Sequence, residues 1–91
     1  MARYKQHFLI AYDIKDPKRL AKVARILCNY ATRIQYSVFH FYGPRNVLDE
    51  CLRQIRLCII NSQDDIRCYG IKPIDQAIIM SAALGRRARR H

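Results

Sequence analysis

The residue with the clearest capacity for chemistry is Asp13, the one carboxylate that ends the apolar stretch HFLIAYD near the start of the chain. An aspartate at a strand end often caps a turn or the next helix, and this is one interpretation of Asp13. Asp16, however, already stands in the N-cap position before Pro17. A carboxylate at the C-terminal end of a central strand also lies where active sites gather on α/β scaffolds, and it suits Mg²⁺ or Mn²⁺. The residue types alone leave both roles open.

The other candidates for catalysis are weak. The three histidines are dispersed along the chain, and no P-loop, GxGxxG, HExxH or GxSxG motif is present. Asp64 and Asp65 indicate the start of a strand after a turn more than a metal site. A single Asp13 is an incomplete ligand set for a metal site, because phosphodiester chemistry with two metal ions needs several carboxylates. A two-fold dimer would supply a second Asp13.

The basic residues predict a polyanionic partner. Seventeen Lys and Arg residues face seven Asp and Glu residues, which gives a formal charge of +10. Three predicted helical positions, Arg19, Lys22 and Arg25, together with Arg33 on the next β segment, could form a phosphate-binding track. The arginines of the C-terminal GRRARRH stretch could add non-specific attraction to a nucleic-acid backbone. A solvated charged face explains any one of these residues, but less easily the whole excess.

Composition predicts one cytoplasmic domain. Half of the chain, 51%, is hydrophobic, which indicates a globular fold of one domain over residues 1–80 with a basic flexible tail over 81–91. The four cysteines form no CxxC pair, which argues against a zinc site. No apolar run approaches the roughly 18 residues of a membrane span, and no signal peptide is evident. We therefore expect a cytoplasmic protein with reduced thiols and no membrane contact.

The pattern of apolar residues predicts the order of the elements. Residues 6–14 suit a central strand buried on both faces, and residues 17–30 have helical spacing after Asp16-Pro17. Residues 32–42 are β-rich and form one strand or a hairpin that turns at Tyr36-Ser37. A second helix runs from about Val47 to near Asn61-Ser62, and strands follow at 64–71 and 76–80. With the hairpin, the order is βαββαβ.

This order predicts a ferredoxin-like α+β fold. Right-handed crossovers then place both helices on one face of a four-stranded antiparallel sheet, with the first and third strands in its centre, plus a short C-terminal strand. The second face of the sheet stays open. In so short a chain, the obvious cover for it is another copy of the same chain.

Two segments together resemble a known family. FLIAYDIKDPKRLAKVARIL is similar to the first strand, catalytic aspartate and first helix of the small CRISPR-associated adaptation nucleases, the second of the two core spacer-acquisition proteins. RIQYSVFHF resembles the Arg-x-Gln-x-Ser-Val-Phe signature of that family, and DDIRCYGI stands where the family has its acidic residue and fourth strand. The resemblance extends over about residues 7–72. Both motifs occur in order and at the family's spacing, which argues against a chance match.

The resemblance implies a ferredoxin-like homodimer in which the C-terminal strand of each protomer extends the sheet of its partner. Asp13 matches the metal-binding aspartate, contributed by both protomers to a site for Mg²⁺ or Mn²⁺. Arg33, Ser37 and Phe39 match signature positions near that site, and Arg19 and Lys22 match the family's basic residues loosely.

The function implied is a scaffold for spacer acquisition that holds duplex DNA for the CRISPR integrase subunit. Family members have also been assigned metal-dependent cleavage of single-stranded RNA or duplex DNA. A toxin-like ribonuclease on the same fold, with no role in spacer acquisition, is the alternative.

Overall fold

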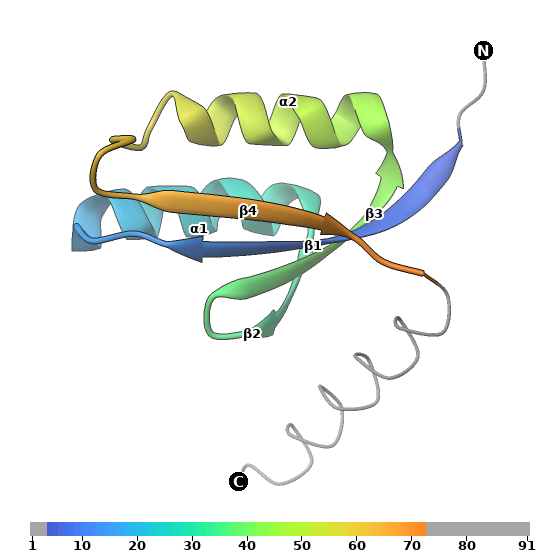
Figure 1. The fold of residues 1–91 in the computed structure, drawn as a ribbon, viewed down its shortest axis with the longest axis horizontal. Helices are drawn as coiled ribbons and strands as arrows, with labels where there is room; N and C mark the ends of the chain where they lie inside the picture. The colour runs from blue at the N-terminus through green and yellow to red at the C-terminus, as the bar shows by residue number, and fades with distance from the viewer. Residues whose placement is uncertain (1–3, 73–91) are drawn as a thin grey trace, which may run out of the picture.

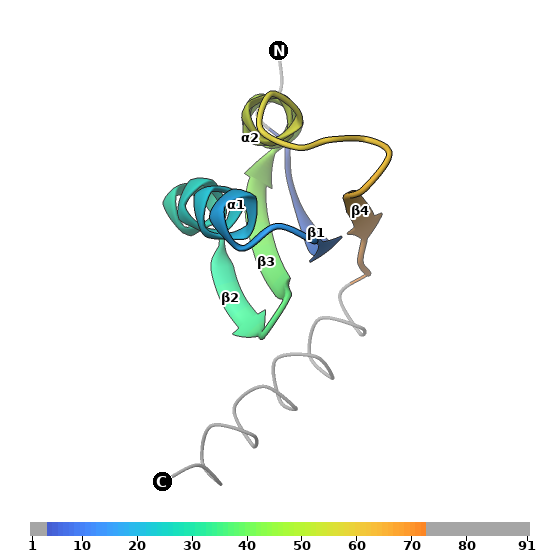
Figure 2. The ribbon, with the colours of Figure 1, turned by 90° about the vertical axis from the view of Figure 1, so that its left-hand side faces the viewer.

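The computed structural model describes residues 4–72 and has the predicted α+β architecture. Four antiparallel strands form one sheet in the order β2-β3-β1-β4 (Figure 1). Figure 2, which views both helices nearly end-on, shows them on the same side of that sheet. The elements are β1 (Lys5–Asp13), α1 (Pro17–Tyr30), β2 (Thr32–Gln35), β3 (Val38–Pro44), α2 (Arg45–Arg56) and β4 (Asp65–Gly70). The ferredoxin-like prediction is therefore confirmed over these residues.

Strand β1 lies in the centre of the sheet, between β3 and β4. Its register with β3 runs from Lys5 opposite Pro44 to Ala11 opposite Val38, and its register with β4 ends with Asp13 opposite Asp65. The β-rich segment after α1 is a hairpin that turns at Tyr36-Ser37, as one of the two predicted alternatives required.

Helix α1 begins where its cap residues predict. The Asp16 carboxylate accepts a hydrogen bond from the Arg19 backbone amide at 2.9 Å, and Pro17 stands in the first turn. Val23 and Leu27 are fully buried against the sheet. Ala31 is extended, so the chain passes from the helix directly into β2.

Helix α2 is shorter than its apolar pattern predicts. It ends at Arg56, and the expected continuation to Asn61-Ser62 is wrong. The buried Asp64 carboxylate accepts a hydrogen bond from the Ile60 backbone amide at 3.0 Å, and the Asp64 amide donates to the Ile60 carbonyl at 2.8 Å. These contacts close a turn at the point where the helix would have continued.

One face of the sheet carries the core. The even-numbered residues of β1 point toward the helices, with Ile10 and Tyr12 buried beside Phe39 and Phe41 of β3. On the opposite face, the β1 side chains of His7, Leu9 and Ala11 are only partly buried within residues 4–72. The expectation that this strand is buried on both faces is therefore met on one face.

The expected strand at 76–80 and the tail at 81–91 lie outside the described residues. Neither helix of the part that the structure describes has the length and apolar character to cross a membrane.

Candidate functional site

Asp13 is the last residue of β1, at the edge where the chain turns toward α1. Its side chain is 72% exposed, and the Lys15 ammonium lies 3.7 Å from its Oδ2. Lys15 is itself 65% exposed, so this ion pair is screened by water and holds the carboxylate only weakly. Asp13 is thus available to a cation or a substrate from solvent.

Asp65 of β4 lies directly opposite Asp13 in the strand register. Directly opposed residues of antiparallel strands point to the same face, with Cβ atoms about 4.5–5.5 Å apart. The Arg67 guanidinium lies 2.8 Å from Asp65 and offsets the repulsion between the two carboxylates. The sequence predicted Asp65 at the start of a strand after a turn, but not its place opposite Asp13, because the pairing of β1 with β4 joins residues 52 positions apart. A predicted antiparallel register between β1 and β4 would have been the signal that places Asp65 opposite Asp13.

The two carboxylates are compatible with Mg²⁺. This ion keeps several of its waters and is commonly held by one or two carboxylates. Within residues 4–72 no group of three or more His, Cys, Asp or Glu side chains could hold a metal ion. A single chain therefore offers the partial ligand set that suits a hydrated Mg²⁺ and not a complete protein cage.

The signature residues lie on the β2-β3 hairpin beside β1. The Arg33 guanidinium stacks on the Phe39 ring, with its Cζ 5.1 Å from the ring centroid, and Phe39 is fully buried. The Ser37 carbonyl accepts a hydrogen bond from the Tyr12 amide at 3.1 Å. The hairpin tip is therefore attached to β1 one residue before Asp13.

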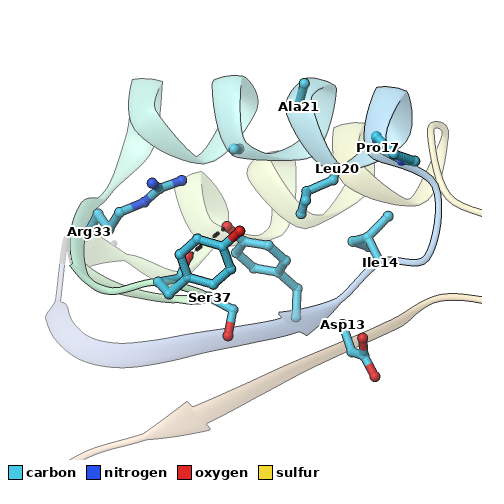
Figure 3. Close-up of a pocket in the computed structure, with 10 residues that line it drawn as sticks. Asp13, Ile14, Pro17, Leu20, Ala21, Arg33 and Ser37 are labelled. Atoms are coloured by element: carbon cyan, nitrogen blue, oxygen red, sulfur yellow. Dashed lines mark hydrogen bonds between the residues drawn. The ribbon is translucent and has the colours of Figure 1, made fainter.

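Arg33 and Ser37 border one open hollow of about 500 Å³ between α1 and the hairpin. Its floor and walls are mostly apolar, from residues such as Ile14 and Leu20. Arg33 and Asp13 lie toward opposite ends of the hollow with Ser37 between them, and the Asp13 carboxylate is directed away from α1 (Figure 3). The structure thus places three of the predicted site residues, Asp13, Arg33 and Ser37, around one cavity.

Arg19 occupies a different environment from the one predicted. Its Nε lies 2.7 Å from Asp64 Oδ2, and its Nη2 contacts both Asp64 Oδ1 and Gln63 Oε1 at 3.1 Å. The Asp64 side chain is fully buried, and the Arg19 guanidinium holds the pKa of this carboxyl well below its usual range. The Arg19 guanidinium is therefore held by Asp64 and Gln63 and is largely shielded from solvent.

Lys22 and Arg25 lie on the exposed side of α1, as their spacing predicts. With Lys18 they form a cluster that we call the α1 basic face: Lys18, Lys22 and Arg25. None of the three makes an ion pair within residues 4–72, and α1 contains no acidic residue. The structure does not bring this face to the Asp13 carboxylate.

Comparison with known proteins identifies relatives of the whole fold. Residues 6–77 match the family model of CRISPR associated protein Cas2. CRISPR-associated endoribonuclease Cas2 1 of Nitrosomonas europaea is 44% identical over 64 residues, which cover 70% of this chain and 61% of that protein. CRISPR-associated endonuclease Cas2 2 of Thermus thermophilus is 36% identical over 67 residues, 74% of each chain.

Solved structures agree with these matches. A hypothetical protein, TT1823 of Thermus thermophilus, superposes with a TM-score of 0.73 at 35% identity, covering 76% of this chain and 84% of that one. Cas2 of Streptococcus pyogenes superposes with a TM-score of 0.67 at 28% identity, covering 72% and 86%. The family that the two motifs indicated is therefore confirmed.

Proposed function

Because this chain belongs to the Cas2 family of CRISPR-associated proteins, we propose that it is a homodimeric subunit of spacer acquisition that holds duplex DNA through its backbone phosphates. In this role it would be the scaffold on which the CRISPR integrase subunit acts. The observation that carries the proposal is the contrast in charge between the two helices.

Helix α2 pairs two of its three arginines with its own acidic residues, while Arg56 has no ion pair among residues 4–72. Arg45 pairs with Asp49 at 3.0 Å, and Arg53 pairs with Glu50 at 2.7 Å, one turn apart on the same helix. The α1 basic face has no such partners. Unpaired Lys and Arg side chains on one exposed helix face bind phosphates without reading the base sequence.

Salt dependence tests the DNA-binding role. The logarithm of affinity for duplex DNA should fall linearly with the logarithm of salt concentration, by about 0.9 per phosphate contact. We expect Lys22→Gln and Arg25→Gln each to reduce that slope by about one contact. Arg53→Gln is the matched control, since it removes an equal charge from a residue already paired with Glu50. Equal affinity at low and moderate salt in the wild-type protein would contradict the proposal.

We further propose that the same chain is an Mg²⁺-dependent endonuclease with Asp13 as its metal-binding residue. The support is a solvent-accessible carboxylate with a second carboxylate, Asp65, opposite it. A bound Mg²⁺ at such a site supplies Lewis-acid activation of water and a phosphate oxygen. Asp13 would hold the ion, and a second protomer would add its own Asp13 across the two-fold axis.

Asp13→Asn tests the nuclease role. This change removes the charge but keeps the size of the side chain, so we expect cleavage to be lost while the fold and DNA binding remain. Asp16→Asn is the matched control, because asparagine caps a helix as well as aspartate does. Single-stranded RNA and duplex DNA should be tested side by side, since the relatives are named both endoribonuclease and endonuclease. Full cleavage by purified Asp13→Asn protein would rule out Asp13 as the metal-binding residue.

A further inference from the structure

The Asp64 carboxylate joins three separate segments of the chain. It is fully buried and accepts hydrogen bonds from the Lys15 amide at 3.1 Å and from the Ile60 amide at 3.0 Å. It also receives the Arg19 guanidinium through Nε at 2.7 Å and Nη2 at 3.1 Å. Lys15 belongs to the loop after β1, Arg19 to the first turn of α1, and Ile60 to the loop after α2. We call this group of four residues the Asp64 clamp.

The clamp lies just beyond the end of the sheet, beside the candidate site. Asp13 is the last residue of β1 and Asp65 is the first residue of β4, and they form the final pair of this strand ladder. Asp64 immediately precedes Asp65, and Lys15 follows Asp13 by two positions. The backbone that carries the two exposed carboxylates is therefore held on one side by the strand ladder and on the other by the clamp.

Burial of the Asp64 carboxylate predicts that the clamp is rigid. A buried carboxylate without partners is strongly unfavourable, so its donors cannot leave one at a time without a large penalty. The bidentate contact with Arg19 adds a fixed orientation to the attraction between charges. Asp13 itself has no comparable support within residues 4–72, because its ion-pair partner there is the exposed ammonium of Lys15.

We propose that Asp64 and Arg19 are positioning residues for the Asp13 site. The inference rests on the proposed nuclease function and adds to it the residues that keep Asp13 and Asp65 in register. Metal-binding and catalytic groups need placement within a fraction of an ångström, which supporting contacts provide. In this proposal Arg19 fixes the position of Asp64 and does not bind phosphate.

Kinetics of Arg19→Gln and Asp64→Asn test the proposal. We expect kcat to fall about tenfold to a hundredfold, the usual effect of losing a supporting contact. The KM for nucleic acid and the salt dependence of binding should stay unchanged. Arg19→Lys keeps the charge and should recover part of the loss. Arg53→Gln, which breaks an exposed pair on α2, is the control and should leave kcat unchanged.

Two measurements do not depend on catalysis. Amide hydrogen exchange at Lys15 and Ile60 should accelerate in Asp64→Asn, while the amides of Phe39 and Phe41 stay protected. Titration with Mn²⁺ alone, followed by electron paramagnetic resonance, should show weaker binding to Arg19→Gln even though Asp13 is intact. If the wild-type protein cleaves nothing, the nuclease proposal fails. Hydrogen exchange and Mn²⁺ binding would still show whether the clamp positions the backbone around Asp13.

Three results would overturn the inference. In the first, Arg19→Gln reduces the salt slope by about one contact with kcat unchanged, which would make Arg19 a phosphate contact. In the second, exchange at Lys15 and Ile60 is the same in Asp64→Asn as in the wild type. In the third, Asp64→Asn unfolds and the milder Arg19→Lys folds with full activity and full Mn²⁺ affinity.

Discussion

Two histidines on the open face of the sheet share one hydrogen bond. His7 Nδ1 and His40 Nε2 are 2.8 Å apart, and the ring planes are 13° from parallel. One nitrogen must donate and the other accept, so the contact is lost when both rings are protonated. The His7 ring also lies 4.2 Å from the Tyr42 ring, over which the Lys5 ammonium is placed.

This arrangement predicts a dependence of stability on pH. Burial, and secondarily the charge of His7, lowers the pKa of His40 below its ordinary 6.5. The unfolded chain therefore takes up a proton before the folded protein does, and the free energy of unfolding should fall as pH drops below about 6.5. His40→Gln should flatten this fall, measured by urea denaturation in steps of pH above the range where carboxylates titrate. An unchanged pH dependence in His40→Gln would contradict the assignment.

At this scale, sequence predicts a residue's place better than its partner. Asp13 stands at the strand end and Asp16 at the N-cap, as local pattern indicates. The contact of Arg19 with Asp64 joins residues 45 positions apart, and helical spacing only says that Arg19 is near the polar side. Which acidic residue it meets depends on how β4 returns beside β1.

Among the elements, those with strong boundary residues were predicted well. Asp16-Pro17 located the start of α1, and the turn at Tyr36-Ser37 separated β2 from β3. The end of α2 was missed because Cys58 and Ile59 continue the helical spacing of apolar residues. They pack against the core from a turn that Asp64 closes, an interaction between a side chain and the backbone that periodicity does not contain.

Gly43 of β3 and Gly70 of β4 offer a test of how tightly the phenylalanine rings of the sheet are packed. A Cβ on Gly43 would lie 3.0 Å from the Cζ of Phe41, whose ring is buried and cannot move freely. We expect Gly43→Ala to lower the free energy of unfolding by about 1–3 kcal/mol, as overpacked cores do. Gly70→Ala is the matched control on β4, where the new Cβ would meet Phe8 at an ordinary 3.5 Å. Denaturation midpoints of the two variants measure the difference, and equal midpoints would contradict the packing argument.

For the molecule as a whole, the sheet face opposite the helices is left uncovered by α1 and α2 (Figure 2). It carries Leu9 and Val38 half-buried, with Tyr42 and Tyr69 exposed at 54% and 49%. Leu9 of β1 lies between His40 of β3 and Tyr69 of β4 in the strand register. A second copy on this face would cover these side chains and bring two Asp13 carboxylates into one assembly, which the proposed nuclease requires.

Lysine substitutions at two leucines, Leu9 and Leu57, test self-association through this face. In the proposed dimer, Leu9→Lys places a charge in the centre of the interface, so we expect monomers by sedimentation velocity at concentrations where the wild type is a dimer. Leu57→Lys is the matched control: Leu57 is 75% exposed just after α2, on the helix side of the molecule, and the variant should remain dimeric. Both variants should keep the wild-type circular dichroism spectrum. A wild-type protein that sediments as a monomer, or a Leu9→Lys variant that dimerises as well as Leu57→Lys, would show that the two copies of Asp13 do not meet through this face.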